Sequence, residues 1–392
     1  MTDQFTLRSS SRSTAVQMPI IPHIAELIRR HPGTISLGQG VVNYEPPPSA
    51  LAAIARFTAD PENHKYKATH GIPPLLDALR IKLARDNHIR ITPNHTLMVT
   101  AGSNMAFAHV IAAITDPDDE VILLTPYYFN HEMALALANV KAVSVPTDDD
   151  HQPRVDWIER AITSRTKAVV TISPNNPTGA VYSETVLRGV NTLCRERGLY
   201  HIHDEAYEYF VFDGAQHFSP ASLPDSAAHT ISLFSFSKTF GMASWRVGYL
   251  LAPAHLDESL RKVQDTVLIC APVISQFAAC GALEIGRDYA AGFLPTYDAM
   301  REQVRTALAP LGERVVVPPT RGALYFYLRV NTPIGALTLA ENLIREHGVA
   351  VIPGTTFGIS DQCCLRISYG ALDPATVCDG MARLVSGLRV IR

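Results

Sequence analysis

Short β-branched and aliphatic runs alternate with helix-compatible segments between residues 96 and 251, and this alternation restricts the fold more than any other feature. Seven such runs occur, namely TLMVTA, EVILLT, KAVSV, KAVVTIS, LYHIHD, HTISLFS and VGYLLA. Strands that alternate with helices form a mainly parallel sheet covered by helices on both faces. We therefore expect an α/β fold whose large domain contains a mainly parallel seven-stranded sheet.

The segment 183–197 illustrates the helical part of the pattern. Ser183 is a favourable N-cap residue, and Glu184 lies in the first turn, where negative charge is stabilised. Arg195 and Arg197 suit the carbonyl end, and a glycine follows as a stop signal. These signals predict one helix between two strands.

The length of the chain indicates two domains, because 392 residues exceed the size at which one hydrophobic core usually keeps growing. From about residue 290 the pattern changes to a long helical stretch followed by short strands and a helix at 334–347. We expect an N-terminal arm that forms part of a small domain (1–45), a large cofactor-binding domain (46–290) and a C-terminal small α+β domain (291–392).

Composition and charge exclude several classes of protein. The formal net charge is −3, and the largest Lys/Arg clusters are pairs, so nucleic acid is not an expected partner. No apolar stretch reaches the roughly 18 residues that a membrane span needs. The six cysteines lack metal-type spacing and lie mostly in apolar surroundings. We expect a cytoplasmic enzyme with reduced thiols, no metal and no membrane contact.

Polar residues follow the predicted strands, where the ligand sites of such sheets lie. Ser103 and Asn104 open an apolar helix, whose free backbone N–H groups favour a phosphate. The rigid loop PNNPTG would hold Asn176 in a fixed direction. Asp204 ends an apolar strand, where a carboxylate must be paired or hydrogen-bonded.

Two further stretches place cations beside apolar strands. SLFSFSKTFGMASWRVGY contains Ser235, Lys238 and Arg246, and CLRISYG contains Arg366. A buried lysine with a lowered pKa can condense with an aldehyde, and a buried aspartate can keep a pyridine nitrogen protonated. Arginine binds carboxylates and phosphates in a two-pronged manner. Together these residues predict pyridoxal 5′-phosphate (PLP) as the cofactor.

The ordered motifs resemble those of the PLP-dependent class I/II aminotransferases of fold type I, the aspartate, aromatic and kynurenine aminotransferase group. The resemblance runs from about residue 34 to the C-terminus and rests on LGQG, YKATHGIPPL, TAGSNMA, PYYF, PNNPTG, DEAYEYF, SFSKTFGMASWRVGY, RGALYF, VIPGTTFG and LRISYG. It implies a fold-type I enzyme that transfers an amino group from an L-amino acid to a 2-oxo acid by a ping-pong mechanism.

The resemblance also implies roles for the catalytic residues. Lys238 matches the Schiff-base lysine, which also moves the proton between the substrate Cα and the cofactor. Asp204 matches the partner of the pyridine nitrogen, and Asn176 and Tyr207 match the pair that binds the phenolic oxygen O3′. Tyr128 falls where an aromatic ring stacks on the cofactor.

Other matching positions concern the phosphate and the substrate. The phosphate site comprises Ser103, Asn104, Ser235 and Arg246, joined by Tyr66 from a neighbouring subunit, which implies a homodimer with shared sites. The site for the α-carboxylate of the substrate comprises Arg366, Asn176 and the backbone at Gly40.

Trp245 and His203 lie next to predicted site residues but are not assigned to the site. Trp245 is interpreted as core packing, and His203 either lies beneath Asp204 or packs within its strand.

The substrate is predicted from what the motifs lack. No motif supplies a second arginine for a side-chain carboxylate, and an unpaired buried charge is costly. Tyr44, Tyr66, Tyr128 and the segment 18–24 are expected to line an apolar pocket for aromatic, methionine-like or other uncharged donors.

Three alternatives stay open. The first is an aspartate-specific aminotransferase that uses an arginine of the N-terminal arm, such as Arg8, Arg12 or Arg30. The other two are a Cβ–S eliminase and an enzyme similar to aminocyclopropane-carboxylate synthase, because lyases use the same scaffold.

Overall fold

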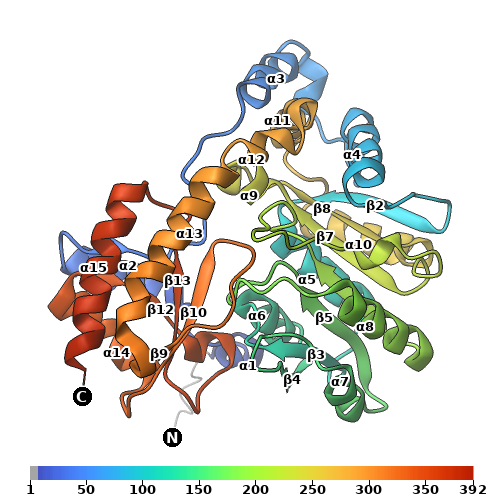
Figure 1. Cartoon of the computed structure of the whole chain (residues 1–392). Helices are drawn as coiled ribbons and strands as arrows, with labels where there is room; N and C mark the ends of the chain where they lie inside the picture. Colours follow the sequence, from blue (N-terminus) through green and yellow to red (C-terminus); the bar gives the residue numbers. More distant parts are fainter. Residues whose placement is uncertain (1–7, 392) are drawn as a thin grey trace, which may run out of the picture.

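The computed structural model of the chain describes residues 8–391, and its largest element is a seven-stranded sheet (Figure 1). Only β8 is antiparallel to its neighbours, and the other neighbouring strands are parallel. The predicted mainly parallel α/β sheet is therefore confirmed. In spatial order its strands are β2 (His95–Thr100), β8 (Gly248–Pro253), β7 (Thr230–Ser235), β6 (Tyr200–Asp204), β5 (Thr166–Ile172), β3 (Glu120–Thr125) and β4 (Lys141–Pro146).

Helices cover both faces of this sheet because successive strand residues point to opposite faces. In β5, for example, Val170 packs beneath α5 and α6, whereas Val169 packs beneath α8. The first face carries α5 (Ser103–Ile114), α6 (Phe129–Leu137) and α10 (Asp257–Val267), and the second carries α4 (Pro73–Asp86), α7 (Val155–Ala161), α8 (Glu184–Arg197) and α11 (Val273–Ile285).

Helix α8 has the ends that the sequence predicts. The Ser183 hydroxyl accepts a hydrogen bond from the backbone N–H of Val186 at 3.3 Å. Gly198 ends the helix in the left-handed region, with φ of +67°. Local capping therefore determines where this helix begins and ends.

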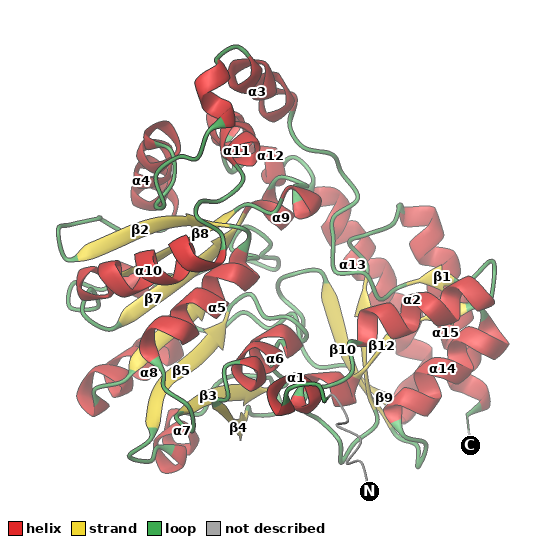
Figure 2. Cartoon of the chain, turned by 180° about the vertical axis from the view of Figure 1, so that it is seen from behind, coloured by secondary structure: helices red, strands yellow, loops and turns green. Residues whose placement is uncertain are grey.

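A second group of strands lies beside the large sheet (Figures 1 and 2). It consists of the antiparallel strands β12 (Ile352–Pro353), β13 (Cys364–Ser368), β10 (Tyr325–Val330) and β9 (Val315–Val316), together with the parallel pair β1 (Ile35–Ser36) and β11 (Val349–Ala350). Around these strands pack α2 (Ile20–Arg30), α13 (Leu294–Leu308), α14 (Ala336–His347) and α15 (Pro374–Val390). The domain boundaries near residues 45 and 290 stay a prediction.

The remaining helices are shorter or peripheral. They are α1 (Ser11–Ala15), α3 (Pro48–Thr58), α9 (Phe236–Thr239) and α12 (Asp288–Ala291). None of the helices in residues 8–391 combines the length and the apolar character that crossing a bilayer requires.

Candidate active site

A cavity of about 360 Å³ lies between the carboxyl ends of the large-sheet strands and the smaller sheet. Almost every residue predicted for the site lines it, although these residues come from distant parts of the chain. They are Gly40, Ser103, Asn104, Tyr128, Asn176, Asp204, Tyr207, Ser235, Lys238, Arg246 and Arg366. The structure therefore brings together side chains that the sequence places up to several hundred residues apart.

Lys238 lies on the short helix α9, directly after β7. Its ammonium group donates to the carbonyl oxygen of Gly40 at 2.5 Å. Burial, together with the nearby Arg366 and Arg246, lowers the pKa of Lys238 to about 8 against the opposing effect of Asp204. A substantial fraction of this amine is neutral near physiological pH, as a nucleophile or base requires.

Asp204 ends β6 and is only 4% exposed. One carboxylate oxygen accepts from the backbone N–H of Ala206 at 3.0 Å, and the other lies 3.3 Å from Nε2 of His131. His131 stacks on Phe107 and is also buried. One oxygen of the carboxylate is therefore held by the backbone, and the other lies against the ring of His131.

The predicted set does not include His131, and it is His131, not His203, whose ring contacts the Asp204 carboxylate. His203 lies on the other face of β6, where its Nδ1 is hydrogen-bonded to the Thr171 hydroxyl at 2.6 Å. The sequence signal for His131 is weak. It lies in α6, three residues after Tyr128, and only the packing of that helix brings it to Asp204.

Two tyrosines and an asparagine lie close to Lys238. The Tyr207 hydroxyl is hydrogen-bonded to that of Tyr325, which the sequence did not single out. The side-chain oxygen of Asn176 accepts from Nη1 of Arg366 at 2.9 Å. The amide nitrogen of Asn176 and the Tyr207 hydroxyl are therefore donors for a ligand in the cavity.

Tyr128 precedes α6 at the edge of the cavity. Its hydroxyl accepts from the Asn130 side chain at 2.8 Å, and its ring meets His131 edge-on, with 5.2 Å between the ring centroids. Burial raises the pKa of Tyr128, so the phenol stays protonated. Trp245, by contrast, packs partly buried against the core beneath β2 and β8, as predicted.

The start of α5 and Arg246 form one end of the cavity. Gly102 precedes this helix with φ of +84°, and a Cβ at this position would collide with the Arg246 guanidinium. Arg246 itself has φ of +49°, and its Nη1 donates to the Ala243 carbonyl at 2.8 Å. A left-handed, non-glycine residue is strained, and such strain is typical of functional positions.

Ser235 and Ser237 complete this end. The Ser235 hydroxyl caps α9 by accepting the N–H of Ser237 at 3.1 Å, and both side chains line the cavity. Free helix N–H groups, hydroxyls and a guanidinium together suit a phosphate.

Arg366 lies at the opposite end, on β13. It is 2% exposed, and its Nη2 donates to the Gly38 carbonyl at 2.7 Å. The guanidinium lies over the Tyr325 ring, 4.6 Å from the centroid. Its buried Nε has no hydrogen-bond partner. An unpartnered, buried guanidinium nitrogen indicates an anionic ligand, such as a carboxylate.

The charges of the cavity fit PLP together with an amino acid. Lys238, Arg246 and Arg366 are the cations among the described residues that line it, and Asp204 is the carboxylate. The excess of positive charge fits one phosphate and one carboxylate. The chemistry of the lining residues also fits, because an amine, a carboxylate and phenol donors are the groups that would bind an aldehyde, a pyridine nitrogen and a phenolic oxygen.

The remaining wall of the cavity is mostly apolar, with Gln39 and Asn130 as its uncharged polar residues. Pro19, Ile20, Ile21 and Pro22 at the start of α2 line it together with Phe129 and Met133 of α6. The predicted segment 18–24 thus contributes to the wall.

Two of the tyrosines predicted for this pocket do not line it. Tyr44 instead donates its hydroxyl to the carbonyl oxygen of Lys238 at 2.7 Å, outside the cavity. Tyr66 is 78% exposed and lies on a separate surface groove. The sequence pattern of strands and helices does not determine where the side chains of loop residues point. The sequence therefore could not show that Tyr128 lines the cavity while Tyr44 and Tyr66 do not.

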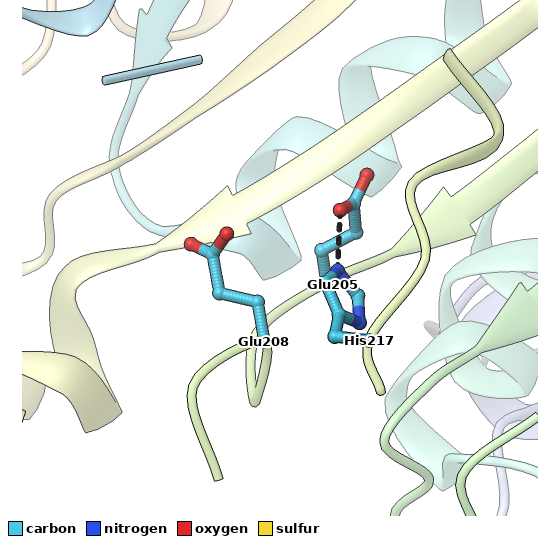
Figure 3. Close-up of side chains that lie close together, drawn as sticks. All are labelled: Glu205, Glu208 and His217. Atoms are coloured by element: carbon cyan, nitrogen blue, oxygen red, sulfur yellow. Dashed lines mark hydrogen bonds and ion pairs between the residues drawn. The ribbon is translucent and has the colours of Figure 1, made fainter. Parts of the chain in front are cut away.

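A second buried polar site lies close to Asp204 in the sequence, and we call it the Glu205 cluster. Figure 3 shows three of its members, Glu205, Glu208 and His217, whose ligand atoms lie within 4.8 Å of one another. Nζ of Lys82 donates to both Glu208 oxygens, at 2.5 and 2.6 Å. The cluster therefore already contains a cation. Its full membership is Lys82, Asn87, Glu205, Glu208, His217 and Ser219.

Comparison with known proteins identifies the family. The family model described as aminotransferase class I and II matches residues 32–384. The chain belongs to this family. It is 34% identical to the aromatic aminotransferase ISS1 of Arabidopsis thaliana over 97% of this chain and 96% of the relative. It is also 34% identical to the aspartate aminotransferase of Pyrococcus abyssi over 86% of this chain and 87% of the relative.

Solved structures agree with this aminotransferase assignment. The aspartate aminotransferase of Thermus thermophilus with maleate superposes with a TM-score of 0.89 at 31% identity, covering 97% of this chain and 100% of that one. The aromatic aminotransferase of Pyrococcus horikoshii gives a TM-score of 0.86 at 31% identity, covering 93% and 98%. The protein is therefore a PLP-dependent aminotransferase of fold type I, and these relatives give no support to the lyase alternatives.

Proposed function

We propose that this aminotransferase takes the amino group from an L-amino acid with an uncharged side chain, aromatic or methionine-like, and passes it to a 2-oxo acid in a ping-pong cycle. The observation that carries the proposal is how charged and uncharged side chains are distributed along the wall of the cavity. Its three cations would be used at the phosphate, the reacting amine and the α-carboxylate, and the wall that remains contains no charged residue and is mostly apolar, with Gln39 and Asn130 as its polar members.

PLP supplies an aldehyde that accepts amines and a protonated ring that withdraws electrons from the substrate Cα. Lys238 would hold the cofactor covalently and then, once released, move the proton from the substrate Cα. The lowered pKa of about 8 supports this role, because burial and two neighbouring guanidinium groups disfavour the charged amine.

The other side chains would hold and polarise the cofactor. The Asp204 carboxylate would keep a proton on the pyridine nitrogen, and the His131 contact at 3.3 Å would keep that carboxylate in place. Tyr207 and the Asn176 amide would donate to the phenolic oxygen. Ser103, Asn104, Ser235 and Arg246 would bind the phosphate, and Tyr128 would contact the ring.

Arg366 would bind the α-carboxylate of both the donor and the acceptor. Its two Nη atoms are already oriented by Asn176 and Gly38, which leaves Nε and the remaining N–H groups for a bidentate contact. A clamp fixed before the substrate arrives loses little entropy on binding.

The side chain of the substrate would meet the wall formed by residues 19–22 and by Phe129 and Met133. An apolar group gains about 25 cal/mol per Å² on burial there, whereas an unpaired carboxylate would be desolvated without a partner. Arg30, one of the arm arginines considered for an aspartate enzyme, is instead paired with Glu26 at 2.8 Å.

Initial rates for the twenty amino acids against a panel of 2-oxo acids test this preference. We expect phenylalanine, tyrosine or methionine to exceed aspartate in kcat/KM by roughly tenfold or more, since tenfold corresponds to about 1.4 kcal/mol of differential binding. Aspartate at the head of the series would make the aspartate-specific alternative the correct one and would leave the aminotransferase assignment intact.

We also propose a homodimer in which Tyr66 of each subunit completes the phosphate site of the other. Tyr66 is 78% exposed and shares a surface groove with Leu268 and with the exposed apolar side chain of Ile274. Arg246 is exposed as well, so the phosphate end of the cavity is open at the surface of the single chain. An exposed apolar surface beside an incomplete anion site favours a second copy of the chain.

Mixing two inactive variants tests the shared site. Tyr66→Ala and Lys238→Ala should each have little activity, but their random mixture should recover about a quarter of the wild-type rate, because half of the dimers would contain one intact site. No recovery in a mixture that sedimentation shows to exchange subunits would contradict the shared site.

The proposed location of the enzyme is the cytoplasm. All six cysteines, of which Cys194, Cys270, Cys363 and Cys364 are buried, are free thiols, and this is typical of reducing compartments.

A further inference from the structure

Tyr325 lies where three parts of the active site meet. It belongs to β10, is 1% exposed, and its hydroxyl is hydrogen-bonded to that of Tyr207. The Arg366 guanidinium lies 4.6 Å from the centroid of its ring. A Cβ at Gly40 would collide with the Tyr325 hydroxyl, so only glycine allows this close approach. Gly40 is also the residue whose carbonyl accepts from Lys238.

The direction of the bond between the two tyrosines follows from their proton count. A phenol donates one hydrogen bond and accepts others. Once Tyr207 gives its single proton to an acceptor in the cavity, its oxygen can only accept from Tyr325. The two hydroxyls then form a donor chain that ends at the ligand. Successive hydrogen bonds in a buried chain polarise and strengthen one another.

Arg366 contacts the ring of Tyr325 and so affects the hydrogen bonds that run from Tyr325 through Tyr207 to the ligand. A guanidinium over an aromatic face attracts the electrons of the ring, which makes the phenol a stronger donor. The ring in turn gives the guanidinium a fixed, apolar platform. One side chain is therefore in contact with both the predicted donor to the cofactor and the predicted clamp on the substrate.

We propose that Tyr325 is a positioning residue that relays a hydrogen bond through Tyr207 to the phenolic oxygen of bound PLP and supports Arg366 for binding of the substrate carboxylate. This inference rests on the proposed function, because it requires Tyr207 and Arg366 to have the roles assigned above.

The groups that face Tyr207 are compatible with its role as a donor. They are Tyr325 from β10, Tyr128 from the start of α6, Arg366 from β13 and Lys238 from α9, whose Nζ is 6.0 Å from the Tyr207 ring. Burial raises the pKa of Tyr207 well above its ordinary value. Tyr207 therefore keeps its proton at the pH values at which the enzyme would be assayed.

The test is a pH titration of the visible absorbance of the PLP-loaded enzyme, which reports the proton on the nitrogen that links PLP to Lys238. A weaker donor leaves more negative charge on the neighbouring phenolic oxygen, so that nitrogen holds its proton more tightly. Tyr207→Phe should raise the titration midpoint by about one unit, and Tyr325→Phe should raise it by roughly half of that.

Two substitutions of Tyr325 test the hydrogen-bond relay and the support of Arg366 separately, because one removes only the hydroxyl and the other also removes the ring. Tyr325→Phe keeps the ring and should leave the KM of donor and acceptor within about twofold of wild type. Tyr325→Leu removes the platform of Arg366 and should raise both KM values roughly fivefold, the size of a partly buried cation–π contact. Equal KM values in the two variants would overturn the second part of the proposal.

Tyr369→Phe is the matched control. This tyrosine is equally buried in the same core, but its hydroxyl donates to the Ala323 carbonyl at 3.2 Å and it does not line the cavity. Its titration midpoint should equal that of wild type. In a Tyr207→Phe background, Tyr325→Phe should cause no further shift, because the relay has lost its middle member.

Two results would contradict the relay. If Tyr207→Phe shifts the midpoint and Tyr325→Phe does not, the relay is wrong while the proposed role of Tyr207 stands. If neither variant shifts it, Tyr207 lacks the assigned role, and the relay fails with it.

Discussion

Asp204 and Glu205 are adjacent in the sequence and both are buried, yet they belong to two polar sites with different charge balance. Asp204 lines a cavity whose other charged groups are Lys238, Arg246 and Arg366. Glu205 accepts from His217 at 2.8 Å within a cluster that also pairs Glu208 with Lys82.

The difference is that the cations of the cavity exceed its carboxylates, whereas the cation of the Glu205 cluster is already paired with Glu208. Cations in a cavity with too few carboxylates are stabilised when anions bind, most of all the buried Arg366, so the cavity is suited to a phosphate and a carboxylate. The Glu205 cluster has its own cation, and its carboxylates already accept hydrogen bonds. We therefore expect changes in the cavity to alter catalysis and changes in the cluster to alter stability.

Lys238→Ala should have the largest effect, because it removes both the covalent anchor and the base. Turnover should be abolished, while the phosphate contacts should still hold PLP non-covalently. Borohydride reduction followed by mass spectrometry of the protein is the measurement. The exposed Lys262 gives a control in Lys262→Ala, which should be fully active. A reducible adduct that persists in Lys238→Ala would mean that another lysine is the anchor.

Lys82→Met should give the largest loss of stability. It would leave Glu208 buried without its cation, and breaking one partner of a buried pair lowers the free energy of unfolding by about 3–5 kcal/mol. Urea unfolding measures this loss, and kcat of the folded enzyme should stay within about twofold.

Two further variants make the cluster prediction specific. Adding Glu208→Gln should recover most of the lost stability, because no buried charge then lacks a partner. Lys262→Met, which breaks an exposed pair with Glu258, should leave the free energy of unfolding almost unchanged. A large drop in kcat for Lys82→Met would show that the cluster acts in catalysis.

Arg366→Lys tests whether the clamp is bidentate. Lysine keeps the charge but not the planar fork, so the KM of the donor and of the acceptor should both rise by roughly 30- to 150-fold, or about 2–3 kcal/mol. The exposed Arg329 on the neighbouring strand provides the control Arg329→Lys, with unchanged KM. A loss confined to one of the two substrates would point to a side-chain contact instead.

Acid should destabilise the protein more gradually. Burial lowers the pKa of His203 to about 4, and burial together with the neighbouring His203 and His229 lowers the pKa of His201 well below its ordinary value of 6.5. Between pH 6.5 and 4 the unfolded chain binds these protons and the folded chain does not, so the free energy of unfolding falls as the pH falls.

The slope of this pH dependence is the measurement. Each buried histidine contributes up to about 1.4 kcal/mol per pH unit. Urea unfolding between pH 7.5 and 5 should therefore show a slope that decreases in His203→Gln and stays the same in the surface variant His64→Gln. A slope that His203→Gln leaves unchanged would assign the acid sensitivity to other groups.

Much of this molecule could be predicted because its signals are local. Ser183 and Gly198 give the ends of α8, and the alternating runs give the strands of the large sheet. The residues after strand ends, such as Asn176, Asp204 and Lys238, come together because the carboxyl ends of parallel strands meet at one edge.

What could not be predicted depends on packing between distant segments. His131 reaches Asp204 only through the position of α6, and Tyr325 reads in the sequence as one more strand aromatic. Tyr44 turns away from the cavity because its hydroxyl meets the backbone of Lys238. The Glu205 cluster joins residues from α4 with residues after β6, and no motif spacing connects them.

The most direct test of the central claim is the half-reaction with phenylalanine alone, followed in the absorbance of the PLP-loaded enzyme. Wild type and Lys82→Met/Glu208→Gln should convert the cofactor to its pyridoxamine form at similar rates. Asp204→Asn should keep PLP but convert it slower by several orders of magnitude, because an unprotonated pyridine withdraws electrons poorly. Near-normal conversion by Asp204→Asn, or loss of conversion in the cluster variant, would contradict the assignment of catalysis to the cavity and of stability to the Glu205 cluster.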